Sequence, residues 1–227
     1  MHAEVDKVQA QLASETDLAG FRAESNLLLS HQVPPDAVQW LTQTPRLDEL
    51  FADPEPANAS RPRSVARAAT AIVPASFLRL CESVVLHRDT ERFALLYRLL
   101  WRLVHEPGLR NDPIDADMMR AQHMAHAVRR DIHKMKAYLR FQPVAEPGAA
   151  QPLQVAWFEP SHHVMECVAP WFSKRHAQER WVILTPERSV RWDGQRLQFA
   201  PGVRREQLPA AEGDATGWLA CVDSVFH

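Results

Sequence analysis

Residues 153–184 read LQVAWFEPSHHVMECVAPWFSKRHAQERWVIL. Residues 153–158 and 181–184 are apolar runs of strand length, and residues 161–176 between them predict a helix that Ser161 caps. A strand, a helix and a second strand in this order predict a right-handed βαβ crossover with two parallel strands. The last third of the chain is therefore built around a sheet.

A hairpin is predicted after the crossover. Asp193-Gly194 separates the apolar residues 190–192 from residues 196–199, and Asp-Gly favours the tight primed turns that join antiparallel strands. Residues 216–226 predict a short closing helix.

The rest of the chain is mainly helical. Residues 8–12 and 37–41 predict strands on either side of a helix at 18–30, which makes a small βαβ unit. Helices are also predicted from Pro74 to residue 86, at 89–105 with its apolar face, and at 114–141. We predict an α+β fold: a mixed sheet with a βαβ crossover and a C-terminal hairpin, plus a central group of helices that includes one long basic helix.

Three segments are predicted. Residues 1–51 form an N-terminal βαβ-like segment, residues 52–64 contain three prolines and form a loop or linker, and residues 65–227 form the main domain. Residues 1–51 either stand apart or join the main domain in one compact unit.

The composition excludes several classes of protein. A 227-residue chain that is 46% hydrophobic and 24% charged can bury a large core. Its three cysteines are far apart and form no CxxC pair, which argues against a disulfide framework or an iron–sulfur cluster and favours buried free thiols. With seven glycines and no phosphate-cradling loop, we expect no nucleotide cofactor. Neither a signal peptide nor a membrane-spanning run is found, so we expect a cytoplasmic protein with no membrane partner.

Residues 121–141 predict a helix with one narrow apolar stripe and a broad basic back. The stripe consists of Ala121, Ala125, Val128, Ile132, Met135 and Leu139. The opposite arc holds Arg129, Arg130, Lys134, Lys136 and Arg140, with His123, His126 and His133 among them. Such a surface can follow the phosphates of nucleic acid, although the net charge of −2 suggests no polyanion partner. The alternative is a solvated face whose cations complement the helix dipole.

A second candidate site is the run Glu159-Pro160-Ser161-His162-His163. It directly follows the predicted strand 153–158, at the sheet edge where open α/β sheets bind ligands. Together with His133, the carboxylate Glu159 and the imidazole His162 could do acid–base or metal chemistry. The alternative is a helix cap with two exposed histidines, and the absence of a further pair with ligand spacing predicts no metal.

The tryptophans in or beside the crossover are expected in the core. Trp157, Trp171 and Trp181 lie in or next to its predicted elements, and aromatic side chains there usually pack inside. A base-stacking platform would instead require exposed rings.

Several of these segments resemble a known family. They are residues 95–103 (LLYRLLWRL), 127–135 (AVRRDIHKM), 155–160 (VAWFEP), 169–172 (APWF) and 180–186 (RWVILTP). The family is a bacterial domain of unknown function assigned to DNA metabolism. It is found beside a radical-SAM protein or fused ahead of a uracil-DNA glycosylase of the UdgX type, which cross-links to abasic DNA. The resemblance covers about residues 71–199, and residues 217–226 resemble the junction of the fused form.

The resemblance implies partners rather than a reaction. It implies DNA and either the radical-SAM protein or the glycosylase domain as partners, and it carries over no catalytic residues. The chain has no glycosylase motif or cluster cysteines, so uracil excision is not assigned to it.

Three functions remain open at this point. The first is an accessory DNA-repair module that binds nucleic acid, or docks a repair enzyme onto it, through the basic helix. The second is an enzyme acting on damaged or modified DNA with His133, Glu159 and His162. The third is a protein-interaction module with an exposed apolar surface.

Overall fold

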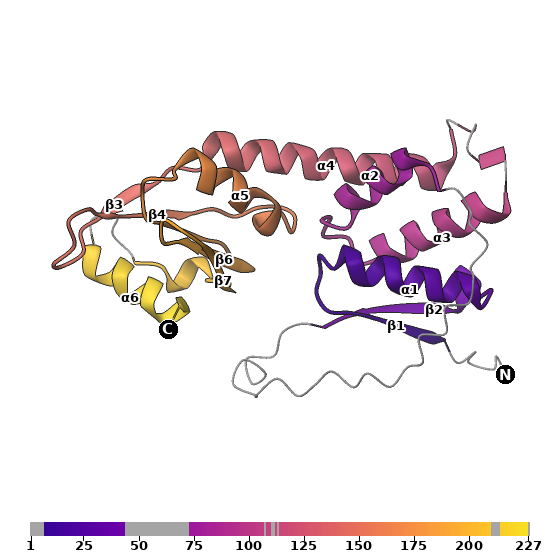
Figure 1. The fold of residues 1–227 in the computed structure, drawn as a ribbon, viewed down its shortest axis with the longest axis horizontal. Coiled ribbons are helices and arrows are strands. Elements are labelled where there is room, and N and C mark those ends of the chain that lie inside the picture. Colours follow the sequence, from indigo (N-terminus) through magenta and orange to yellow (C-terminus); the bar gives the residue numbers. More distant parts are fainter. Residues whose placement is uncertain are drawn as a thin grey trace. The chain divides into compact units, whose positions relative to one another are not determined.

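The computed structural model describes residues 7–43, 73–106, 108–109, 112, 114–209 and 214–226 (Figure 1). The chain forms two compact units, residues 1–127 and 128–227, which we describe separately. The boundary falls within helix α4 (Ala116–Tyr138). The linker predicted at 52–64 lies outside the described residues, so the division into 1–51, 52–64 and 65–227 stays a prediction.

The first unit opens with the predicted βαβ arrangement. Strands β1 (Val8–Leu12) and β2 (Val38–Thr42) pair in parallel, and α1 (Leu18–Ser30) connects them. Asp17 caps α1, because its carboxylate accepts a hydrogen bond from the Gly20 N–H at 2.7 Å.

Two further helices of the first unit pack against the βαβ arrangement. They are α2 (Ala75–Val84) and α3 (Arg92–His105), whose apolar faces are buried. Arg98 Nε and Nη2 donate to Asp117 at 2.8 and 2.7 Å, and Arg102 donates to Asp115 at 2.7 Å. These ion pairs hold α3 to the first turns of α4, so both arginines have structural partners.

The second unit is built on a five-stranded mixed sheet in the order β3-β4-β5-β6-β7. The strands are β3 (Gln142–Val144), β4 (Leu153–Trp157), β5 (Trp181–Leu184), β6 (Arg188–Trp192) and β7 (Leu197–Pro201). Strands β4 and β5 are parallel, and α5 (Met165–Arg175) lies between them in sequence. The other neighbours are antiparallel. The predicted α+β fold, its βαβ crossover and its C-terminal hairpin are confirmed.

Both faces of the sheet are covered. Helix α6 (Ala215–Phe226) contributes Trp218 and Val222 to a buried cluster with Val155 and Val182. Trp181 points to the opposite face, where its ring centroid lies 6.2 Å from that of Phe172 on α5. The sheet is therefore the middle layer of the second unit.

Some predicted boundaries are wrong. Helix α5 begins at Met165 rather than at residue 161, and Ser161 does not cap it. The reason is that residues 161–163 bend, with the His162 N–H bound by the Asp131 carboxylate. The long helix is Ala116–Tyr138 rather than 114–141, and β3 was not expected because Pro143 lies at its centre.

The three cysteines are free thiols, as expected. Cys81 is buried and Cys221 is half-buried, but Cys167 on α5 is exposed, so the expectation that all are buried is wrong for it. Among the described residues, no helix combines the length and apolar character needed to cross a membrane.

Candidate nucleic-acid interface

The second half of α4 places its apolar and basic residues on opposite sides. Val128 and Met135 are fully buried and Leu139 is 7% exposed, at the spacing that puts one helix face against the core. Apart from the buried Asp131, the intervening polar positions face outward. We call the following outward residues the basic face: Arg129, Arg130, His133, Lys134, Lys136 and Arg140.

The cations of the basic face differ in their exposure and in their interaction partners. Arg129, Arg130 and Lys134 are exposed and form no ion pair with any described residue. Arg140 donates to the Ala137 carbonyl at 2.7 Å and so caps the end of α4. Lys136 is half-buried, with its Nζ 5.3 Å from the centroid of the Trp171 ring.

His126 and His133 belong to different units. His133 belongs to the basic face and is exposed. His126, also predicted to contact nucleic acid, is exposed on the last turn of α4 that belongs to the first unit. Both are accessible to solvent in their own units.

The basic face carries no exposed carboxylate. The one acidic residue in residues 128–140, Asp131, is only 5% exposed. Its Oδ2 accepts a hydrogen bond from the His162 N–H at 2.9 Å. Within residues 128–227, Arg and Lys outnumber Asp and Glu, so the acidic excess of the chain lies in residues 1–127. The overall charge therefore understates how cationic this surface is.

The expectation that all three crossover tryptophans are buried is wrong for Trp171. Trp181 is fully buried and Trp157 is half-buried, whereas Trp171 is 39% exposed beside Lys136. Helical spacing in the sequence could have indicated this, because Trp171 falls at the edge of the face formed by the buried residues Met165, Val168, Ala169 and Phe172.

The second candidate site lies at the C-terminal ends of β4 and β5. Glu159 follows β4 and is exposed, and the His163 Nδ1 lies 2.7 Å from Glu187 Oε2 in the turn after β5. The structure thus brings His163 together with Glu187 at this edge of the sheet. Sequence reasoning missed it because the two residues belong to different loops.

Of the three predicted acid–base residues, His162 is linked by a hydrogen bond to the helix that carries His133. His162 is held by its backbone to Asp131, two positions from His133. Within the described ranges, neither the His133 side chain nor the Glu159 side chain makes a hydrogen bond or an ion pair. No group of three or more His, Cys, Asp or Glu side chains that could hold a metal occurs in the part of the chain that the structure describes.

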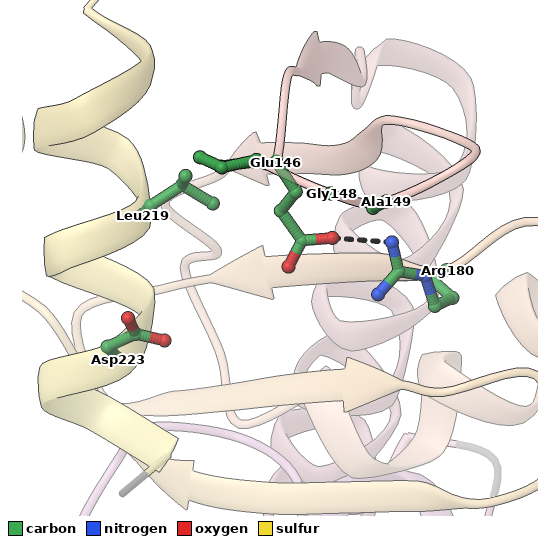
Figure 2. Close-up of a pocket in the computed structure, with 7 residues that line it drawn as sticks. Glu146, Gly148, Ala149, Arg180, Leu219 and Asp223 are labelled. Atoms are coloured by element: carbon green, nitrogen blue, oxygen red, sulfur yellow. Dashed lines mark hydrogen bonds and ion pairs between the residues drawn. The ribbon is translucent and has the colours of Figure 1, made fainter.

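A small open pocket of about 370 Å³ lies between the β3–β4 loop and α6 (Figure 2). Figure 2 shows Glu146 and Arg180 joined by an ion pair, with Leu219 and Asp223 of α6 facing them. Its one guanidinium already has a carboxylate partner, so the pocket offers little to an anionic ligand. The sequence predicted no site here.

The comparisons with known proteins identify a family but no described relative. No curated protein and no solved structure matches the chain. A family model matches residues 90–208, which run from the start of α3 past the β6–β7 hairpin and include the basic face. This span exceeds half of the 227 residues. The chain therefore belongs to the family described as domain of unknown function DUF4130.

Proposed function

We propose that this protein is an accessory module of DNA metabolism that binds nucleic acid through the basic face. The observation that carries the proposal is the arrangement of charge on α4. Arg129, Arg130 and Lys134 are exposed and form no ion pair with a described residue, while Asp131 is turned into the protein. A solvated surface helix usually mixes both signs of charge.

Phosphate is the ligand that this chemistry favours. Guanidinium and ammonium groups bind phosphate oxygens through charge-assisted hydrogen bonds, and counterion release adds to the affinity. Contacts to the backbone position a protein without reading sequence. The proposed module therefore binds DNA with affinity but without sequence preference.

The resemblance supports a role beside an enzyme. In this proposal the module docks a radical-SAM protein or a uracil-DNA glycosylase domain onto DNA. The DNA contacts come from the basic face, and the enzyme supplies the reaction. A pure interaction module would instead bind no DNA. Its capture of that enzyme would survive charge reversal on the basic face but fail when an exposed apolar surface is altered.

One observation favours a second candidate, an enzyme acting on damaged or modified DNA. The loops after β4 and β5 bring Glu159, His162 and the His163–Glu187 pair to the carboxyl edge of two parallel strands. This edge is where α/β sheets place ligands. The second candidate predicts that Glu159→Gln or His162→Ala abolishes turnover while DNA affinity persists.

The test is binding of fluorescein-labelled DNA, measured by anisotropy. The variant Arg129→Glu/Arg130→Glu/Lys134→Glu should lose at least ten-fold in affinity, because phosphate contacts dominate non-specific binding. The matched control is Lys7→Glu/Arg79→Glu/Arg204→Glu, which changes the net charge equally at exposed positions outside the basic face. Equal losses in both triple variants would contradict the proposed site.

A further inference from the structure

Trp171 is an exposed aromatic ring in a cationic setting. It projects from α5 with 39% of its surface exposed, and the Lys136 ammonium lies 5.3 Å from its ring centroid. One side of α5 is buried and consists of Met165, Val168, Ala169 and Phe172. An exposed tryptophan on a helix that otherwise buries its apolar side suggests a ligand for the ring.

The neighbours of Trp171 on α5 are also basic. Lys174 and Arg175 lie three and four residues beyond it, which places them on the same side of the helix, and both are exposed. They form no ion pair with any residue in the described ranges. Trp171 is therefore flanked by cations on its own helix as well as by Lys136.

Helices α4 and α5 run side by side at this surface (Figure 1). Lys136 contacts Trp171, and a few residues later the Phe141 ring lies 6.0 Å from Phe172 and 5.2 Å from His176. One row of the basic face, spaced by three or four residues, therefore continues onto α5. The row on α4 consists of Arg129, His133, Lys136 and Arg140.

A cationic strip with an aromatic ring in it matches single-stranded nucleic acid. The backbone of a single strand follows the cations, and an unpaired base stacks on the ring whatever its identity. In a duplex the base faces are already stacked on one another, so no base face remains available to the ring. A ring at this position would add nothing to duplex binding.

We propose that the ligand of this surface is single-stranded DNA, with one base stacked on Trp171. The base takes the place of the Lys136 ammonium over the ring, and Lys136 then pairs with the adjacent phosphate. This inference rests on the proposed function, because it needs the basic face to bind DNA. It adds the strandedness of the ligand and names the residue that selects it.

The experiment compares a labelled single strand with a duplex of the same length, at one salt concentration, for four proteins. Wild type should bind the single strand more tightly than the duplex. Trp171→Ala should weaken single-strand binding roughly 5- to 150-fold, the range for loss of one base–aromatic stack, and leave duplex binding unchanged. Trp171→Phe should retain most of the affinity.

The fourth protein is a matched control, Phe199→Ala. Phe199 is 36% exposed with the Arg188 guanidinium 5.7 Å from its ring centroid, so it is also an exposed ring beside a cation, but it lies on β7. This variant should bind both DNAs as wild type does. If Trp171→Ala binds the single strand as tightly as wild type, the inference is overturned while the proposed function stands. If wild type binds neither DNA, the proposed function itself fails.

Discussion

The carboxylate of Asp131 accepts a hydrogen bond from the backbone N–H of His162 at 2.9 Å. The bond ties α4 to the loop that follows β4, and it delays the start of α5 to Met165. It also keeps the one acidic side chain of residues 128–140 inside the protein. One contact thus shapes the loop of the second candidate site and leaves the basic face without a carboxylate.

Asp131→Ala should destabilise the protein by about 1–3 kcal/mol, because it leaves a poorly hydrated N–H without its acceptor. Asp131→Asn keeps an acceptor oxygen and should cost less. The free energy of unfolding in urea measures both effects. The exposed neighbour Glu159, changed to alanine, should stay within about 0.5 kcal/mol of wild type. If Asp131→Ala lowers the free energy of unfolding no more than Glu159→Ala does, the role of this hydrogen bond is contradicted.

Arg92 is a buried cation that stabilises the first unit through hydrogen bonds to backbone carbonyls. It is 1% exposed, and it donates to the Val85 carbonyl at 2.9 Å and to the Glu15 carbonyl at 2.6 Å. Arg92→Met should cost about 3 kcal/mol in urea unfolding, since it removes several donors to buried acceptors at once. The control is Arg79→Met on the exposed side of α2, expected near zero. Similar costs for the two substitutions would show that the Arg92 contacts contribute nothing.

The cysteines should differ in reactivity. Cys167 is exposed, whereas burial raises the pKa of the Cys81 thiol to about 12 and also raises that of Cys221. A thiol-specific reagent at pH 8 should therefore label one site quickly in the native protein, and Cys167→Ser should remove that phase. Cys81 should react only after unfolding. Rapid labelling in Cys167→Ser would contradict the burial of the other two.

The raised pKa of Cys81 predicts that the protein loses stability at alkaline pH. The pKa of Cys81 is higher in the folded protein than in the unfolded chain, where it is about 8.5. The contribution of Cys81 to the free energy of unfolding is therefore fully present below pH 8.5. It is lost as the pH rises toward 12, because the Cys81 thiol ionises more easily in the unfolded chain than in the folded protein. The variant Cys81→Ala should show a shallower decline in unfolding free energy between pH 8.5 and 10. An unchanged slope would contradict this shift.

Local patterns predicted most of the fold. The strands at 8–12 and 181–184 and the helix at 18–30 match the structure residue for residue. Residues 8–12 alternate apolar and polar, residues 181–184 form a continuous apolar run, and Asp17 caps the helix. The three-residue strand β3 has neither property, because Pro143 removes a donor and the strand exists only through its pairing with β4.

The candidate sites were predictable only where one helix carries them. The basic face follows from helical spacing alone, so Arg129, Arg130 and Lys134 could be placed on the surface from the sequence. The Asp131–His162 hydrogen bond, the His163–Glu187 pair and the contact of Lys136 with Trp171 join separate elements. Each depends on tertiary packing, which residue spacing does not encode.

The most direct test of the central claim, that the basic face binds DNA phosphates, is the salt dependence of DNA affinity. For wild type, the logarithm of the affinity should fall linearly with the logarithm of salt concentration, with a slope of roughly −0.7 for each phosphate neutralised on a single strand. The variant Arg129→Glu/Arg130→Glu/Lys134→Glu should show weaker binding and a slope smaller in magnitude by about 2. A wild type that binds no DNA at low salt, or a variant with an unchanged slope, would contradict the claim.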